Sequence, residues 1–174
     1  MRSFSRHWSA FFVFFCVFFF IGFFPFAVCG EEAGDAGPRF LENADGTVTD
    51  QESGLVWLQN AGCLGSMNWE EANKACAHLA EGACGLEDGS KAGAWRLPTK
   101  QELTGLLVQA KPRPHLPEGH PFSEVQPTYY WTTSETSYDA SFVWGVHFLI
   151  GSGCNVKKTN KHPVWCVREA ISKK

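Results

Sequence analysis

The segment 95–103 combines a break in extended structure with the start of a helix, so it fixes how a strand and a helix must meet. Pro98 disfavours the α conformation at Leu97, so we expect an extended segment to end there. Thr99 and Glu102 have the spacing of a capping box, in which each side chain accepts a hydrogen bond from the other residue's amide. The sequence therefore predicts a corner between strand and helix. The residues that form this corner are Trp95, Arg96, Pro98, Thr99 and Glu102.

Two helices are predicted from caps and apolar periodicity. Asn68 can cap a helix over about 69–81, with Trp69, Ala72 and Cys76 on its apolar face. The capping box starts a second helix over about 99–109. Segments rich in β-branched and aromatic residues lie at 39–41, 47–50, 55–58, 129–133, 142–150, 154–158 and 163–168. Strands before and after a pair of helices predict an α+β domain with an antiparallel sheet.

Asp45-Gly46 lies between two of these predicted strands, which indicates a hairpin turn. Together with Glu52, the same pair can be aligned with a calcium-binding EF-hand loop. That alignment places Leu41 where the first carboxylate ligand is required, and no helix flanks the segment. The turn is the favoured interpretation, and we predict neither a metal site nor a cofactor.

The amino-terminal residues have the pattern of a secretory signal. Arg2 and Arg6 precede an apolar run over 10–21, and the small residues at 27–30 offer a cleavage site. The run is shorter than the ~20 apolar residues of a membrane span, so we expect cleavage, with an uncleaved anchor or a lipid on Cys29 as alternatives. The predicted organisation is a signal peptide over 1–30, a flexible leader over 31–38, one folded domain over 39–170 and a basic tail over 171–174.

The charge of the predicted mature chain argues against a general nucleic-acid-binding function. Arg2 and Arg6 are two of the 15 basic residues, so 13 remain against 18 acidic residues, a net charge near −5. Acidic residues dominate positions 31–60, and basic residues dominate positions 157–174. This asymmetry allows a local site for a polyanion within an acidic protein.

Cysteine usage agrees with export. Of the seven cysteines, Cys16 and Cys29 fall in the predicted signal, so five remain in the mature chain. Five cysteines in an exported domain predict two disulfides and one unpaired thiol, and the spacing alone leaves the pairing open. The sequence has no CxxC and no Cys/His cluster at zinc-finger spacing, so disulfides are favoured over zinc.

Six short motifs occur in a fixed order along the chain. They are DGTVTD at 45–50, SGLVW at 53–57, GSMNW at 65–69, WRLPT at 95–99, YWTTS at 130–134 and VWCVR at 164–168. Together, over residues 39–169, they resemble the Lcl C-terminal domain family, a bacterial domain long catalogued as of unknown function. The resemblance implies a C-type-lectin-like fold and an extracytoplasmic location. The namesake domain ends a trimeric collagen-like adhesin and binds sulfated polysaccharides, but this sequence has no Gly-x-y tract, so trimerisation does not carry over.

The resemblance also implies how the cysteines pair. A cysteine of the first helix pairs with one of the last strand, and a second bridge joins the segments before and after that helix. The implied pairs are Cys76 with Cys166 and Cys63 with Cys84, which leaves Cys154. Calcium-dependent lectins use a loop with a carboxylate; the corresponding Gln126-Pro127-Thr128 has none, so we expect no lectin-type calcium site.

Five residues are candidates for ligand binding. Lys157, Lys158 and Lys161 are the best candidates for a polyanion site, although lysines on a strand edge also prevent edge-to-edge aggregation. Trp131 and Trp144 are the best candidates for stacking on a sugar, although core packing is the default for both. We expect an exported, non-catalytic binding or adhesion module that recognises a sulfated polysaccharide or an envelope protein, in the periplasm or at the cell surface.

Two other functions are kept as alternatives. The first is a structural or assembly component that recognises another subunit of a cell-surface complex. The second is an enzyme related to formylglycine-generating enzymes, which share the lectin-like fold and use a pair of reactive cysteines. Structural bridges account better for the cysteines here. Nothing in the sequence fixes the oligomeric state.

Overall fold

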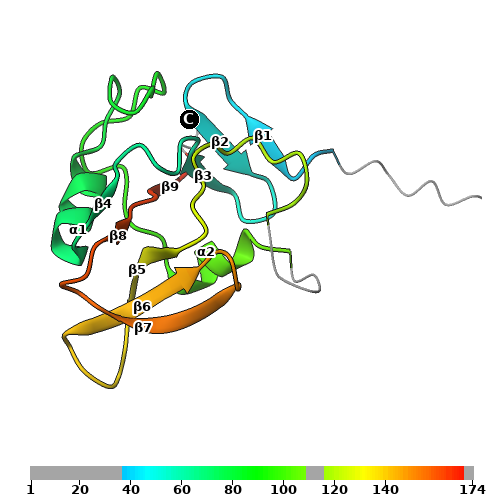
Figure 1. Cartoon of the computed structure of the whole chain (residues 1–174). Helices are drawn as coiled ribbons and strands as arrows, with labels where there is room; N and C mark the ends of the chain where they lie inside the picture. The colour runs from blue at the N-terminus through cyan, green and yellow to red at the C-terminus, as the bar shows by residue number, and fades with distance from the viewer. Residues whose placement is uncertain (1–36, 109–115, 171–174) are drawn as a thin grey trace, which may run out of the picture. The chain divides into compact units, whose positions relative to one another are not determined.

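A computed structural model describes residues 37–108 and 116–170 of the chain (Figure 1). The predicted signal peptide, the basic tail and most of the predicted leader lie outside these residues. The described part is built of antiparallel β-strands and two short helices, which confirms the α+β class. Within it, no helix has the length and apolar character needed to cross a membrane.

The largest sheet joins the two ends of the described domain. Its strands are β1 (Phe40–Glu42), β2 (Thr47–Asp50), β3 (Leu55–Leu58) and β9 (Val167–Glu169). They are ordered β1-β2-β3-β9, and every neighbouring pair is antiparallel. Since β9 is the last strand of the chain and lies beside β3, the amino-terminal and carboxy-terminal segments share one sheet (Figure 1).

The predicted turn at Asp45-Gly46 connects β1 and β2. Gly46 has a φ of 79°, in the left-handed region that favours glycine. A Cβ at this position would also collide with the backbone carbonyl of Gly85. Asp45 Oδ1 accepts hydrogen bonds from the amide and the hydroxyl of Thr47, at 3.0 and 2.6 Å. The carboxylate therefore stabilises the turn.

A second sheet carries the carboxy-terminal half of the domain. It consists of β5 (Tyr129–Glu135), β6 (Phe142–His147) and β7 (Ser152–Lys157), while β4 (Ser66–Met67) pairs with β8 (His162–Pro163). The strand predicted over 142–150 ends earlier, at His147. The amide of Gly151 donates to the carbonyl of His147 at 2.7 Å, which closes a turn there. The strand predicted over 163–168 is divided into β8 and β9 by a buried segment at 164–166.

Both helices begin where predicted and end earlier. Helix α1 (Trp69–His78) starts at Asn68 with a complete capping box, and α2 (Lys100–Gly105) starts at Thr99 with another. Helix α1 ends because Leu79 adopts an extended conformation that buries its side chain. After α2, Leu106 and Leu107 make tighter turns that place both side chains in the core.

The predicted corner is formed as expected. Arg96 pairs with Val167 through backbone hydrogen bonds of 2.9 Å in both directions, which attaches the corner to β9. Its guanidinium donates two hydrogen bonds to Glu102, at 2.8 and 2.9 Å, and one to Glu169 at 2.9 Å. The carbonyl of Pro98 accepts from the amide of Thr133 on β5 at 2.8 Å. This corner therefore connects the first sheet, α2 and the second sheet.

The core between these elements is rich in tryptophan. Four indoles are almost completely buried, those of Trp57, Trp95, Trp131 and Trp165. The Trp165 indole donates to the carbonyl of Leu58 at 2.7 Å and lies 5.5 Å from Trp57, centroid to centroid. Large rings with a paired N–H contribute much buried apolar area and fix the packing of their neighbours.

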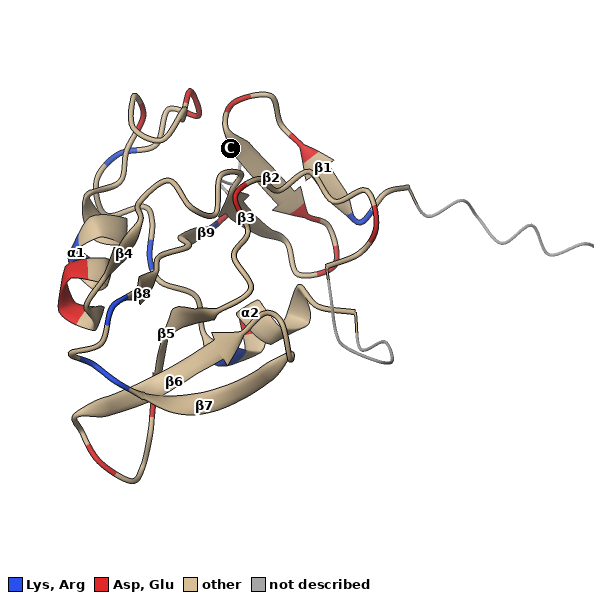
Figure 2. Cartoon of the chain, viewed as in Figure 1, with Lys and Arg blue, Asp and Glu red and all other residues tan. Residues whose placement is uncertain are grey.

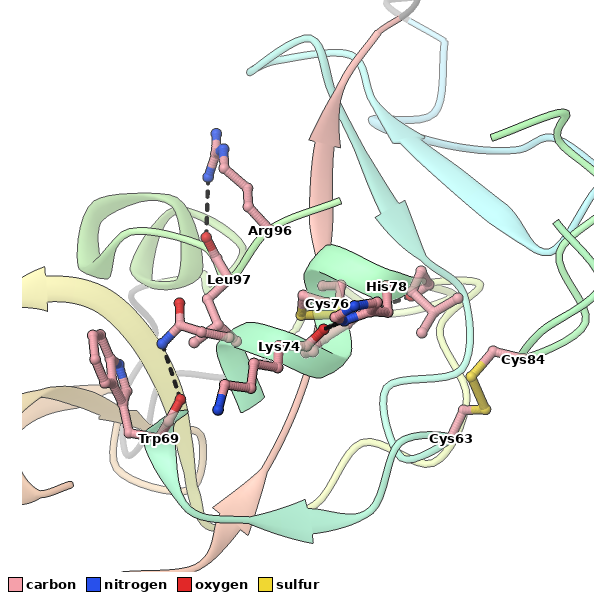
Figure 3. Close-up of a disulfide and its surroundings, with 12 residues drawn as sticks. Cys63, Trp69, Lys74, Cys76, His78, Cys84, Arg96 and Leu97 are labelled. Carbon is pink, nitrogen blue, oxygen red and sulfur yellow. Dashed lines mark hydrogen bonds between the residues drawn. A yellow bond between two sulfur atoms is a disulfide. The ribbon is translucent and has the colours of Figure 1, made fainter. Parts of the chain in front are cut away.

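Two disulfides connect distant parts of the chain. They join Cys63 to Cys84 and Cys76 to Cys166, the pairs that the family resemblance implied. Figure 3 shows the first bridge beside α1, with Cys76 on the helix itself. Cys154 is the free cysteine of the described residues, and it is exposed.

Candidate ligand-binding surface

Lys157, Lys158 and Lys161, called here the lysine surface, lie on the connection between β7 and β8. Lys157 ends β7 and Lys161 precedes β8. The amide of Asn160 donates to the carbonyl of Lys157 at 2.9 Å, so the connection is a tight turn. Figure 2 shows the basic residues of this turn close together at one side of the second sheet. The structure therefore brings the three predicted lysines onto one short segment.

Lys158 is the most firmly held of the three. Its amide donates to the carbonyl of Ser141 at 2.9 Å, and its carbonyl accepts from the amide of Trp69 at 3.0 Å. The Lys158 Nζ lies 4.3 Å from the centroid of the Trp69 ring, and the Trp69 indole donates to the carbonyl of Thr132 at 2.9 Å. A cation over an aromatic face is attracted by the ring quadrupole. The indole thus positions the ammonium group.

Acidic residues border the lysine surface on two sides. Glu70 and Glu71 lie in the first turn of α1, and Glu135 and Asp139 lie at the end of β5 and in the loop after it (Figure 2). Within the described residues, no carboxylate comes within ion-pair distance of the three lysines. The ammonium groups are therefore not neutralised by direct pairing there.

Asp139 is held in its charged form. Its Oδ1 accepts hydrogen bonds from the backbone amide and the hydroxyl of Ser141, both at 2.8 Å. These bonds, with a smaller contribution from the charge of Lys157, lower the pKa of Asp139 from its ordinary value. The surface therefore presents fixed charges of both signs.

Two hollows lie beside Lys158. One has a volume of about 290 Å³ and is lined by the β5–β6 loop, including Glu135, Tyr138 and Asp139. The other has a volume of about 270 Å³ and is lined by residues at the start of α1, including Asn68 and Glu70. Because Lys158 lines both, it is the central residue of this surface.

The two predicted tryptophans differ in burial and in their partners. Trp131 is fully buried, and its indole donates to the carbonyl of Met67 at 2.8 Å. Trp144 is half-buried, and the Nζ of Lys100 lies 3.5 Å from its ring centroid, so that ammonium occupies one face of the ring. The ring that the structure places against the lysine surface is that of Trp69.

Sequence reasoning missed Trp69 and Tyr138 as members of this surface. Trp69 was assigned to the apolar face of the first helix, yet it is only partly buried and contacts Lys158. Tyr138 is 84% exposed, the highest value among the large hydrophobic side chains described as exposed. The signal was present in the sequence, because Tyr138 is the single aromatic residue in the polar stretch 135–141.

A second group of ionisable side chains surrounds Tyr129. The Tyr129 ring lies 4.6 Å from the ring of His147 and 5.7 Å from that of His162, centroid to centroid. Burial, with a smaller contribution from the charge of His147, lowers the pKa of His162. Burial and the neighbouring Cys154 raise the pKa of Tyr129. A hollow of about 230 Å³ lies beside Tyr129, Cys154 and His162.

Cys154 is the potential nucleophile of this second group. The Cys154 Sγ lies 3.7 Å from the carbonyl oxygen of Asn155, and no described histidine forms a hydrogen bond with it. The mechanism of formylglycine-generating enzymes needs a pair of reactive cysteines, whereas four of the five described cysteines are in disulfides. In the described part of the chain, no group of three or more His, Cys, Asp or Glu side chains is placed to hold a metal ion.

The fold and this surface define a small, disulfide-linked α+β domain with a mixed-charge surface around a fixed lysine. The family model of the Lcl C-terminal domain matches residues 46–168, more than half of the chain. The chain belongs to this family. A comparison with curated proteins finds no match.

Proposed function

We propose that this protein is an exported, non-catalytic binding module that recognises a sulfated polysaccharide through the lysine surface. The observation that carries the proposal is the arrangement of Lys157, Lys158 and Lys161 on one turn, unpaired with any described carboxylate. The Trp69 ring contacts the ammonium group of Lys158, the residue that lines both hollows. Regularly spaced anions of a polysaccharide can contact several such cations at once, with release of counterions.

The proposed fold is that of C-type lectins, and the proposed location is outside the cytoplasm. The sheet that joins both ends of the domain supports the fold, as does the disulfide from the first helix to the residue before β9. Two disulfides support the location, since disulfides persist in oxidising compartments. The charged start and apolar run of the amino terminus agree with export.

The test is retention of the mature protein on immobilised heparin, with neutral dextran as the reference and with salt varied. We expect retention on heparin alone, insensitive to a chelator and weakened by salt. The affinity of the wild type should fall with salt, and the variant Lys157→Ala/Lys161→Ala should make this dependence less steep. The magnitude of the slope of log affinity against log salt should decrease by about 2, since each lost contact changes it by about 0.9 in the analogous nucleic-acid case.

The matched control is Lys74→Ala/Lys91→Ala, which removes two exposed lysines from α1 and from the loop before the corner. This control should keep the wild-type slope. An equal loss of heparin retention in both double variants would show that only the total charge of the protein matters. Heparin retention abolished by the chelator would contradict a lysine-based site.

An assembly component is the second candidate, favoured by a separate apolar surface. Leu149 and Ile150 are 43% and 48% exposed in the turn after β6. The next residue, Gly151, lines a hollow of about 600 Å³ together with Lys100 and Leu107. Exposed apolar side chains beside a hollow are typical of a protein-binding surface. Absence of heparin retention would make this surface the next to be tested.

A further inference from the structure

The outer strand of the second sheet, β7, has one edge without a partner strand. The order of the sheet is β5-β6-β7, so β6 pairs with one side of β7 (Figure 1). This pairing runs without a register shift from the pair Phe142 and Lys157 to the pair His147 and Ser152. Within the described residues, β7 is therefore a regular edge strand of six residues. Such an edge is a template for pairing with another polypeptide.

The alternation of hydrogen bonds shows which backbone groups of β7 point outward. In an antiparallel pair, every second residue directs both its amide and its carbonyl to the neighbouring strand. The amide of Lys158 donates to the carbonyl of Ser141 at 2.9 Å, and this bond continues the β6–β7 pairing. Lys158 and every second residue before it therefore face β6. The amides and carbonyls of Gly153 and Asn155 face away from it.

Hydrogen bonds on the other side of β6 agree with this alternation. Trp144, which lies opposite Asn155, directs its carbonyl to β5, where the hydroxyl of Thr132 donates to it at 2.6 Å. Within the described residues, the amides of Gly153 and Asn155 have no acceptor. The carbonyl of Asn155 has only the distant Sγ of Cys154, at 3.7 Å. The edge therefore offers unpaired donors and acceptors to an added strand.

The hollow of about 230 Å³ lies along the same strand. Its lining includes the consecutive β7 residues 154–157, together with Tyr129, Phe142 and His162. The volume is below the roughly 300–1,000 Å³ of small-molecule pockets, so the hollow suits one side chain of a larger ligand. Aromatic rings in the lining favour an apolar side chain there. When a peptide adds to a sheet edge, main-chain hydrogen bonds supply affinity and such pockets supply specificity.

The charge around this edge favours an acidic partner. The sequence has no Asp or Glu between Asp139 and Glu169, so β6, β7 and the turn between them carry no carboxylate side chain. Lys157 ends β7, and near its other end a Cβ at Gly153 would lie 3.3 Å from the Nζ of Lys100. Ammonium groups therefore lie towards both ends of the edge. A second copy pairing through β7 would bring two such basic edges together, which like charges oppose.

We propose that the free edge of β7 binds an extended acidic peptide segment of a partner protein, which adds to the second sheet as its fourth strand. Gly153 and Asn155 exchange main-chain hydrogen bonds with the peptide, and Lys100 and Lys157 attract its carboxylates. One apolar side chain of the peptide enters the hollow beside Tyr129. This inference goes beyond the proposed function, because it concerns recognition of a polypeptide main chain and does not depend on polysaccharide binding.

The first test measures binding of fluorescein-labelled peptides to the mature protein by fluorescence anisotropy. The probe is the peptide DEVFVED, and the charge control is KKVFVKK, which should not bind. Two further forms of the probe carry backbone N-methyl groups on alternate residues, in opposite phases, so that each lacks the amide donors of one edge. We expect one form to bind like the probe and the other at least about tenfold more weakly. Absence of probe binding, or equal binding of both methylated forms, would overturn the proposal.

Amide hydrogen exchange locates the added strand. The amides of Gly153 and Asn155 should exchange rapidly in the free protein and slowly with the probe, whereas those of Cys154 and Val156 should exchange slowly in both states. Protection of Gly153 and Asn155 that appears when the protein alone is concentrated would show that a second copy covers the edge, which would contradict a peptide partner. Binding of the probe without new protection at these two amides would show charge attraction only and would also contradict the proposal.

The variant Asn155→Pro removes one outward amide, at a position where an edge strand tolerates proline because its N–H faces solvent. It should weaken binding of the probe about tenfold, while the matched control Asn155→Ala keeps the amide and should bind normally. Asn155→Pro also keeps every lysine, so heparin retention should be unchanged. Heparin retention without probe binding would reject the β7 edge and leave the polysaccharide function standing, and probe binding without heparin retention would do the reverse.

Discussion

Arg96 connects α2 and β9 at the corner through charge-assisted hydrogen bonds to Glu102 and Glu169. Glu102 accepts two hydrogen bonds from Arg96 and one from the amide of Thr99, at 2.7 Å. Burial alone would raise the pKa of Glu102, but these hydrogen bonds outweigh burial, so the pKa lies below its ordinary value. The same hydrogen bonding has the opposite effect on the cation, because it raises the pKa of Arg96 above its ordinary value. The pair therefore stays charged at neutral pH.

The lowered pKa predicts how stability changes on acidification. A carboxylate with a depressed pKa in the folded state stabilises the fold above its unfolded pKa, about 4.3, and this contribution is lost as the pH falls through the folded pKa. We expect Glu102→Gln to lower the free energy of unfolding by about 1 kcal/mol at pH 7, because Arg96 is partly exposed to solvent. The difference between the two proteins should shrink between about pH 5 and pH 3, in urea unfolding experiments.

The control for this prediction is Glu81→Gln, which changes an exposed glutamate that forms no ion pair with a described residue. Its free energy of unfolding should follow the wild type at every pH. A Glu102→Gln protein that keeps the same deficit at pH 3 as at pH 7 would show that the loss comes from packing and not from the charge.

At the scale of elements, the two disulfides constrain the chain unequally. The Cys76–Cys166 bridge spans 90 residues and attaches α1 to the segment before β9, whereas the Cys63–Cys84 bridge spans 21 residues. The loop-closure model gives about 4.6 kcal/mol for the first and about 3.3 kcal/mol for the second. Cys76 and Cys166 are also fully buried, so their removal leaves a cavity.

We therefore expect Cys76→Ala/Cys166→Ala to lower the melting temperature more than Cys63→Ala/Cys84→Ala. Calorimetry of the two double variants measures the difference, which should exceed about 1 kcal/mol in the free energy of unfolding. Equal destabilisation, or a larger effect of the shorter bridge, would show that the Cys63–Cys84 bridge also stabilises structure outside the loop that it closes.

Local signals in the sequence were sufficient for the starts of the elements. Asn68, Thr99 and Gly46 predicted two caps and a turn, and each is formed, because a cap or a left-handed turn depends on a few neighbouring residues. The ends of the helices and of β6 were placed too late. They depend on tertiary contacts, such as burial of Leu79, which local periodicity does not contain.

The candidate site was predicted only in part for the same reason. The three lysines are close in sequence, so their grouping was visible, but the aromatic partner of Lys158 comes from α1. Contacts between segments so far apart in sequence require the three-dimensional arrangement of the strands. The disulfide pairing, which spacing left open, came from the family resemblance and is confirmed.

At the scale of the whole molecule, the net charge and the two disulfides favour local binding of a polyanion over general attraction of polyanions. The predicted mature chain has a net charge near −5, so its overall charge repels a polyanion, and the proposed attraction at the lysine surface has to be local. The two disulfides hold the described domain together in an oxidising environment. This distribution of charge agrees with the proposed binding of a polyanion at the lysine surface.

Export, oxidation and folding together predict one accessible thiol in the native mature protein. Removal of residues 1–30 eliminates Cys16 and Cys29, and the disulfides occupy four of the remaining five cysteines, which leaves exposed Cys154. We expect an aromatic disulfide reagent to modify about one thiol per native chain and about five after reduction and unfolding, with Cys154→Ser abolishing the native reaction.

A native protein with no reactive thiol, together with a dimer that reductant dissociates, would instead show that Cys154 links two copies. Native reaction of two or more thiols would show that a predicted bridge is open or that the amino-terminal cysteines are retained, and mass spectrometry of the labelled peptides separates these outcomes.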